Sequence, residues 1–213
     1  MSQINPKIKH LYLHVPFCER FCAYCDFCHY LNKERFIVPW LSALKKEIAQ
    51  KDLNSDYETI YIGGGTPSAL SLNHLKSLFE MLWPFAKSVK EYTFEANPEN
   101  LDEKKIELLK SFGINRISLG VQSHDPKILK AIGRRHNFSD VKKVIAFLKS
   151  SGIDNISIDL IYGLPFQDLA SFKTSLEEVL DLKIDHLSLY ALTIEKGTKL
   201  YAQNYQAISE DLD

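Results

Sequence analysis

Six short runs of apolar and β-branched residues recur along the chain, and longer segments with a helical pattern of apolar residues lie between most of them. The runs cover residues 11–15, 59–62, 92–95, 116–119, 156–161 and 186–190. In the segment 141–148, apolar residues stand at positions i, i+3, i+4 and i+7, which places them on one face of a helix. This alternation predicts a parallel sheet built from βαβ units.

Six strand–helix units are too few for a closed eight-stranded barrel, but they suit an open one. We therefore predict an α/β fold, an open (βα)6 partial TIM-type barrel. The chain of 213 residues can bury one sizeable core, and no internal repeat, low-complexity tract or linker divides it. We expect residues 1–213 to form a single domain, with ligands bound at the C-terminal ends of the strands.

The ends of several helices are marked by capping residues. Asn100 stands three residues before Glu103, which is the spacing of a capping box, and Asp125 precedes a proline at the first position of another helix. Gly113 and Gly152 follow helical segments where a left-handed residue is favoured. These residues predict where the connecting loops lie.

Residues typical of ligand sites follow five of the predicted strands. A cysteine-rich loop follows the first, and the others are followed by residues 63–67, 95–98, 120–123 and 159–165. Each motif alone has an ordinary structural explanation: a tight glycine turn, a helix cap or a side chain bonded to the backbone. Because the C-terminal ends of parallel strands meet at one rim, the set together predicts a binding site.

All four cysteines lie in the loop after the first strand, and Cys18, Cys22 and Cys25 follow a C-x3-C-x2-C spacing. Three thiolates this close in sequence can converge on one metal centre if the backbone between them is a loop. An iron–sulfur cubane normally takes four cysteines, one for each iron. Three cysteines would therefore leave one iron open to an exogenous ligand.

Other uses of these cysteines remain open at this point. Cys28 lies three residues after Cys25, so a four-cysteine zinc site is conceivable. A redox pair of Cys22 and Cys25 is also conceivable, although it leaves Cys18 unexplained. Disulfides are disfavoured because nothing in the sequence suggests secretion.

The charge balance excludes some functions. The chain has 26 lysines and arginines against 27 aspartates and glutamates, which provides no electrostatic footprint for nucleic acid. Its N-terminus lacks the apolar run of a signal peptide, and no stretch approaches the ~18 apolar residues of a membrane span. We expect a soluble cytoplasmic protein with no membrane span, in a reducing compartment that suits thiolate ligands.

Several of these segments resemble one family. Residues 11–18 with the cysteine loop, and residues 63–68, 119–123 and 158–165, are similar in order to the oxygen-independent coproporphyrinogen III oxidase family. These are radical S-adenosylmethionine (radical SAM) proteins, and the resemblance covers essentially the whole chain. It implies that the three cysteines ligate a [4Fe-4S] cluster whose open iron chelates the amino and carboxylate groups of SAM.

The resemblance also implies which side chains contact SAM. Glycines let the backbone approach a ligand closely, carboxylates accept hydrogen bonds from ribose hydroxyls or an ammonium group, and arginine offers fixed donors to a carboxylate. Some of these residues would contact a second SAM in the oxidase. The matching positions are Tyr12, Tyr24, Gly64, Gly65, Thr66, Glu95, Gln122, Arg134 and Asp159.

The family has two branches, which differ just after the third cysteine. True oxidases carry a further cysteine two positions later, where this chain has Phe27, and Cys28 is displaced from that place by one residue. The pair Asp26-Phe27 is typical of the haem chaperones, which are thought to bind haem and transfer it to respiratory apoproteins. The resemblance thus implies a haem chaperone-like protein, with no coproporphyrinogen oxidation expected.

Two further interpretations stay open: an oxidase or other radical SAM enzyme with a small substrate, and a non-catalytic metal-binding module. Family members continue into a C-terminal domain that carries a His-Asn-x-x-Tyr motif associated with haem, whereas this sequence ends at Asp213. The segment 136–140 is not that motif, because Asp140 stands where tyrosine is needed. We therefore expect the family's C-terminal domain to be absent, and haem binding by these 213 residues to be weak.

Overall fold

The computed structural model describes residues 8–27, 30–51, 53 and 56–207. Its main feature is a sheet of six strands that are all parallel, in the order β1-β4-β5-β6-β7-β8. All six predicted strands are confirmed. They are β1 (His10–Val15), β4 (Thr59–Gly64), β5 (Glu91–Ala96), β6 (Arg116–Gln122), β7 (Asn155–Tyr162) and β8 (His186–Ala191).

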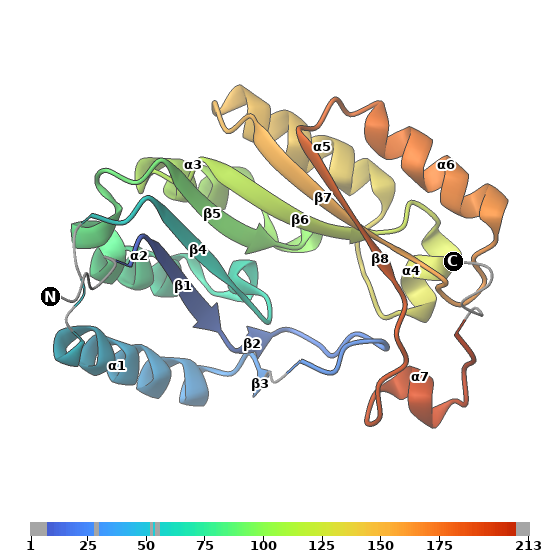
Figure 1. Cartoon of the computed structure of the whole chain (residues 1–213), viewed down its shortest axis with the longest axis horizontal. Helices are drawn as coiled ribbons and strands as arrows, with labels where there is room; N and C mark the ends of the chain where they lie inside the picture. The colour runs from blue at the N-terminus through green and yellow to red at the C-terminus, as the bar shows by residue number, and fades with distance from the viewer. Residues whose placement is uncertain (1–7, 28–29, 52, 54–55, 208–213) are drawn as a thin grey trace, which may run out of the picture.

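The longer helices lie around the outside of the curved sheet (Figure 1). Two short parallel strands, β2 (Phe17–Cys18) and β3 (Tyr30–Leu31), bracket the cysteine loop. The α-helices are α1 (Glu34–Gln50), α2 (Leu72–Ala86), α3 (Glu103–Ser111), α4 (Pro126–Ala131), α5 (Phe138–Ser150), α6 (Leu169–Leu180) and α7 (Lys199–Ala202). Short 3-10 helices follow β4 and β5, namely η1 (Pro67–Ala69) and η2 (Pro98–Asn100).

The barrel is open because β1 and β8 are the two edges of this sheet and are not paired with each other in the described residues. This confirms the predicted partial barrel. Among those residues, no helix combines the length and hydrophobicity needed to cross a bilayer. The assignment of the whole chain to a single domain stays a prediction.

The two faces of the sheet have different compositions. On β5, Tyr92 and Phe94 are almost fully buried in the main apolar core, among residues contributed by the surrounding helices. Because side chains alternate along a strand, Thr93 and Glu95 face the inside of the barrel. The apolar outer face thus stabilises the fold, and the polar inner face is left for a site.

A second apolar cluster ties the cysteine loop to the end of the described chain. Its buried members are Ala23, Ile128, Leu129, Ile132, Ile161, Leu164, Leu192 and Leu200. The amide of Ala23 donates to the carbonyl of Ile132 at 3.0 Å, and the amide of Leu200 donates to the carbonyl of Ala23 at 2.9 Å. The loop is therefore held between α4 and α7.

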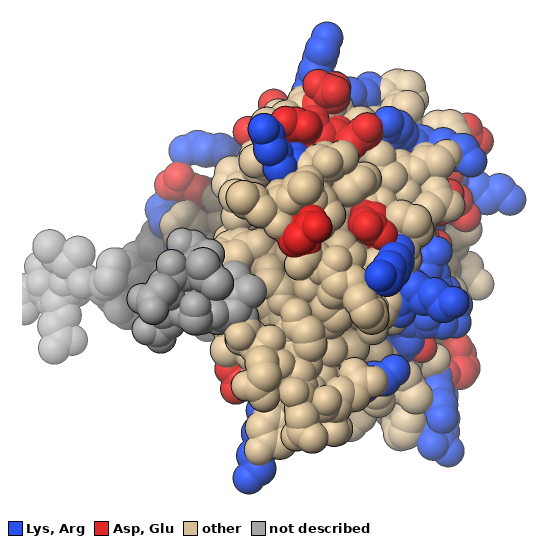
Figure 2. All heavy atoms as spheres, turned by 90° about the vertical axis from the view of Figure 1, so that its right-hand side faces the viewer, with Lys and Arg blue, Asp and Glu red and all other residues tan. Residues whose placement is uncertain are grey.

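The face that carries α4, α6 and α7 is covered mainly by uncharged side chains (Figure 2). Two large apolar side chains near the start of α6 are exposed: Phe166 is 66% and Leu169 is 83% exposed. The Lys127 ammonium group lies 4.4 Å from the centre of the Phe166 ring, within the range of a cation–π contact.

Most of the predicted helix ends are confirmed. Asp125 caps α4 by accepting from two backbone amides, and Gly113 and Gly152 have φ angles of 81° and 74°. The prediction for Asn100 is wrong, because Asp102 caps α3 through the amide of Lys105. Asn100 ends η2 instead, and its side chain donates to Glu19 at 2.9 Å.

Candidate functional site

A cavity of about 640 Å³ opens at the C-terminal ends of the strands, a volume typical of small-molecule sites. Its walls come from the cysteine loop and from the residues that end or follow β4 to β8. The strand-end motifs thus meet at one rim, as the sequence predicted. Of the residues expected to bind a cluster or SAM, those that line this cavity are Cys18, Cys22, Cys25, Tyr24, Gly64, Gly65, Thr66, Glu95, Gln122, Arg134 and Asp159.

Backbone hydrogen bonds hold the cysteine loop on the end of the sheet. The carbonyl of Cys18 accepts from the amide of Asn32 at 2.7 Å, and the carbonyl of Phe17 accepts from the amide of Thr66 at 2.7 Å. The Cys18 sulfur also lies 3.3 Å from the Thr66 hydroxyl oxygen. Cys28 lies outside the described residues.

Burial is the largest influence on the pKa values of the Cys18 and Cys25 thiols, and it raises both. It raises the pKa of Cys18 to about 11, against a lowering by the Thr66 hydrogen bond. Burial also raises the pKa of Cys25, against a backbone hydrogen bond at Phe27. Both thiols are therefore protonated at neutral pH without a metal, and binding a metal centre would release their protons.

The donor set suits a cluster better than a single ion. Within the described residues, no three histidine, cysteine, aspartate or glutamate side chains lie close enough to hold one metal ion. In a cubane each cysteine binds a different iron, so the sulfurs stand further apart than the ligands of one ion. Three thiols in one loop that faces a cavity agree with that wider arrangement.

The glycine turn after β4 packs against the cysteine loop. A Cβ atom on Gly65 would lie 2.8 Å from the carbonyl oxygen of Phe17 and 3.0 Å from the sulfur of Cys18. Gly64 has a φ of 117°, and a Cβ there would lie 2.9 Å from the carbonyl oxygen of Val15. These glycines therefore allow the turn to pack closely against the end of β1 and the start of the cysteine loop, a role that the sequence did not reveal.

Two half-buried carboxyl groups stand on neighbouring parts of the cavity wall. Glu95 accepts from the Tyr61 hydroxyl at 2.6 Å and from the Gly64 amide at 3.0 Å. Asp159 accepts from the Ser118 hydroxyl at 3.3 Å. Burial is the main cause that raises the pKa of each carboxyl, in opposition to these hydrogen bonds. Both groups are poised to accept bonds from hydroxyl or ammonium donors.

Gln122 occupies a strained position at the end of β6. Its φ is 68°, in the left-handed region that non-glycine residues seldom adopt, and the pairing with β7 shifts between Gly120 and Gln122. A Cβ on Gly120 would lie 2.9 Å from the Gln122 amide nitrogen and 3.0 Å from Arg134 Nη2. Such strain is often found at functional sites, and here it turns a buried amide into the cavity.

Arg134 stands on the loop that precedes α5 and lines the cavity. Its Nη2 donates to the Tyr24 hydroxyl at 3.2 Å, while its Nε is buried without a hydrogen-bond partner. Burial raises the pKa of Tyr24, so this phenol is neutral and its oxygen accepts. An unpaired guanidinium donor at the wall fits the carboxylate of a ligand.

Tyr12 is the one predicted contact outside the cavity lining. It is 56% exposed on β1, its hydroxyl lies 3.0 Å from Nδ1 of His14, and its ring stacks on Tyr61 at 5.9 Å. The inner face of β1 thus carries an aromatic group beside the cavity rather than within its wall.

The cavity also contains residues that the sequence did not single out. Arg20 stood in the cysteine loop without an evident task, and Ser118 was hidden within a strand. No sequence motif marked the part of the wall that is formed by the end of β8 and the residues after it. This part includes Tyr190, Thr193 and Glu195. Only their place after a predicted strand could have indicated them.

Comparison with known proteins agrees with this geometry. Residues 12–179 match the model of the Radical SAM superfamily. The chain is 39% identical to "Heme chaperone HemW" of Bacillus subtilis over 200 residues, covering 91% of the chain and 53% of that protein. It is 36% identical to the Escherichia coli protein of that name over 196 residues, covering 88% and 51%.

A solved structure shows the same architecture. Coproporphyrinogen III oxidase (HemN) from Escherichia coli, described as a radical SAM enzyme, superposes with a TM-score of 0.84 at 26% identity, over 95% of this chain and 49% of that one. The chain spans about half the length of the curated relatives it matches. From its family match and its fold, the chain belongs to the radical SAM superfamily.

Proposed function

We propose that Cys18, Cys22 and Cys25 bind a [4Fe-4S] cluster and that SAM occupies the adjoining cavity. The observation that carries this is the position of three thiols from one loop on the wall of a cavity that the strand-end motifs also line. A cluster and SAM are the cofactors of this superfamily. When bound, the reduced cluster supplies the electron that cleaves SAM.

The residues of this chain would hold SAM by complementary chemistry. Arg134 offers its unpaired Nε to the methionyl carboxylate, and Glu95 and Asp159 accept from ammonium or ribose hydroxyl groups. Gly64, Gly65 and Thr66 supply backbone groups, Tyr24 orients Arg134, and Gln122 completes the polar wall. Tyr12 would contact SAM from beside the cavity.

We assign the chain to haem or porphyrin handling of the chaperone kind. Curated relatives named "Heme chaperone HemW" support this, as does Phe27 at the position of the oxidase's extra cysteine. In this proposal the protein is cytoplasmic, folds as one domain over residues 1–213 and passes haem to apoproteins. An oxidase is the second candidate, since the fold closely matches that of the oxidase structure.

Anaerobic reconstitution with iron and sulfide separates these functions. We expect a brown protein that binds SAM and, with reductant and coproporphyrinogen III, forms no protoporphyrinogen above background. A true oxidase under the same conditions serves as the positive control. Product formation by this chain would establish the oxidase instead, and a colourless zinc protein would indicate a metal-binding module.

Haem titration addresses the second half of the proposal. The open rim gives a large apolar ligand little enclosure, so we expect these 213 residues to bind haem more weakly than a full-length relative does. A saturable one-to-one complex as tight as the relative's, followed by the haem absorption band, would place the whole haem site in the barrel itself.

A further inference from the structure

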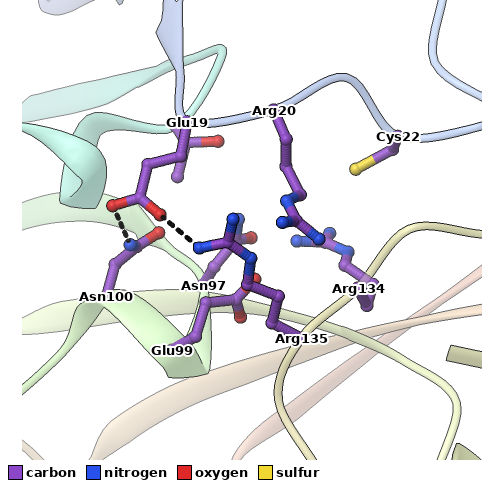
Figure 3. A pocket seen from close by; sticks show the side chains of 9 residues that line it. Glu19, Arg20, Cys22, Asn97, Glu99, Asn100, Arg134 and Arg135 are labelled. Carbon is purple, nitrogen blue, oxygen red and sulfur yellow. Dashed lines mark hydrogen bonds and ion pairs between the residues drawn. The ribbon is translucent and has the colours of Figure 1, made fainter. Parts of the chain in front are cut away.

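A smaller pocket, drawn in Figure 3, shares Arg134 with the lining of the main cavity. This side pocket lies between the cysteine loop and the loop before α5. Residues that define it are Glu19, Arg20, Cys22, Glu99, Arg134 and Arg135. Arg20, Cys22 and Arg134 also line the main cavity, so the two spaces share a wall.

The three arginines reach the side pocket from two separate loops and point toward one another (Figure 3). Arg20 uses Nη1 to donate to the carbonyl of Gly133 at 3.2 Å, and its Nε is buried without a partner. Buried donors without acceptors are costly, so the pocket holds unmet hydrogen-bonding capacity.

The glutamates do not balance this positive charge. Oε2 of Glu99 lies 2.9 Å from Nδ1 of the buried His136, whose Nε2 lies 3.1 Å from the carbonyl oxygen of Val121. A carbonyl only accepts, so Nε2 donates. Burial acts to raise the pKa of Glu99, but the His136 hydrogen bond and the charge of Arg134 outweigh it, and the pKa is lowered.

With Glu99 ionised, two carboxylates face the three guanidinium groups. Glu19 accepts from the Asn100 side chain at 2.9 Å, and its Oε2 lies 3.9 Å from Nη1 of Arg135, at the long end of the range for an ion pair. The side pocket therefore carries an excess of positive charge.

We propose that the side pocket binds a carboxylate group of a ligand other than SAM, held by Arg20 and Arg135. Guanidinium forks match planar carboxylates in a bidentate way. A carboxylate is favoured over phosphate because the pocket has a volume of only about 20 Å³, which suits a planar group better than a tetrahedral one. The carboxylate comes either from a small free acid or, where the haem-handling function proposed above holds, from a tetrapyrrole propionate.

Trifluoroacetate serves as a probe of the side pocket. It is titrated with the protein at constant ionic strength, binding is measured by the broadening of its 19F resonance, and the titration is done with both cluster-loaded and metal-free protein. We expect saturable binding that weakens about tenfold in Arg20→Gln and in Arg135→Gln, the loss of a charge-assisted hydrogen bond. Arg35→Gln is the control, because Arg35 is an exposed residue on α1 and lies outside the lining of both pockets. Equal weakening in all three variants, or no saturation, would overturn the proposal.

Competition identifies the source. SAM should not displace trifluoroacetate; competitive displacement would mean that the pocket only holds the SAM carboxylate, against the proposal. Displacement by haem but not by its dimethyl ester assigns the site to a propionate, and displacement by neither assigns it to a free acid. Trifluoroacetate binding by protein that fails to form a cluster would refute the proposed function and leave the side pocket supported.

Discussion

The imidazole of His136 and the carboxylate of Glu99 form a buried hydrogen-bonded pair, with Nδ1 and Oε2 2.9 Å apart. The His136 side chain is 0% exposed and that of Glu99 is 16% exposed. Because Glu99 lies in η2, the pair fixes the loop that bears Arg134 and Arg135 onto the end of β5. The two guanidinium groups are thereby positioned by His136, which lines neither pocket.

Replacing Glu99 by Gln should lower the free energy of unfolding by about 1–3 kcal/mol, since a buried hydrogen bond to a charged carboxylate is then replaced by a neutral one or lost. Glu34→Gln is the matched control, because Oε1 of Glu34 lies 3.1 Å from Nε2 of His74 in a glutamate–histidine pair at the surface, where the glutamate is 74% exposed. The control should lose less than about 1 kcal/mol in urea titrations. Equal losses would contradict a special role for the buried pair.

The same pair predicts an acid-sensitive loop. The folded-state pKa of Glu99 is below its unfolded value of 4.5, so the pair's stabilisation is complete above that value. It is lost as the pH falls through the lower folded value. The difference in unfolding free energy between wild type and Glu99→Gln should therefore shrink on acidification below about pH 4.5; a constant difference would show that Glu99 is not ionised.

Single Cys→Ala variants should separate the cluster ligands from the fourth cysteine. Loss of Cys18, Cys22 or Cys25 removes a ligand from a cluster that has only three, so the iron retained after anaerobic reconstitution should fall sharply. Cys28→Ala should retain iron at the wild-type level. Equal iron loss from Cys28→Ala and Cys22→Ala would point to a four-cysteine site.

Glu95→Gln should weaken SAM binding by about tenfold, through loss of a charged acceptor, without weakening the fold. Burial raises the folded pKa of Glu95, so its ionised form costs stability at neutral pH, and that cost disappears as the pH falls through the folded value. The variant should thus unfold at the same or a higher temperature at pH 8. Glu91→Gln, at the start of β5 and outside the cavity lining, should leave calorimetric SAM titrations unchanged.

Leu200→Ala should loosen the cysteine loop, because Leu200 is 2% exposed in the second apolar cluster beside Ala23. We expect the variant to lose iron to a chelator faster than the wild type does. If the second apolar cluster unfolds together with the sheet, the free energy of unfolding should fall by at most about 2–5 kcal/mol. Tyr201→Ala, a 48% exposed neighbour on α7, is the control. If both variants lose iron at the same rate, α7 does not hold the loop.

The periodicity of the sequence was sufficient for the sheet, because each strand is specified by a local apolar run. The ends were harder to predict: residues 116–119 were expected as a strand, yet β6 continues to Gln122. From the sequence, Gly120 and Gln122 were expected to follow the strand. They belong to the strand because its pairing with β7 shifts by one residue between them. Local patterns do not encode such a shift.

The rim of the site was predictable for a similar reason, since each motif directly follows a strand. The side pocket was not, because Arg20 and Arg135 come from loops far apart in sequence and meet only in the folded chain. The cap at Asp102 was missed because Asn100 offers an equally suitable side chain, which tertiary structure directs to Glu19 instead. Contacts between distant segments decided both cases.

The bond from Leu200 to Ala23 also sets an order of events during synthesis. A nascent chain displays all three cluster thiols long before the ribosome reaches α7, and until then nothing holds Ala23 from that side. The loop can acquire its final geometry only after the segment around Leu200 has emerged and packed. In the proposed site, iron–sulfur assembly on this loop therefore follows the synthesis of α7.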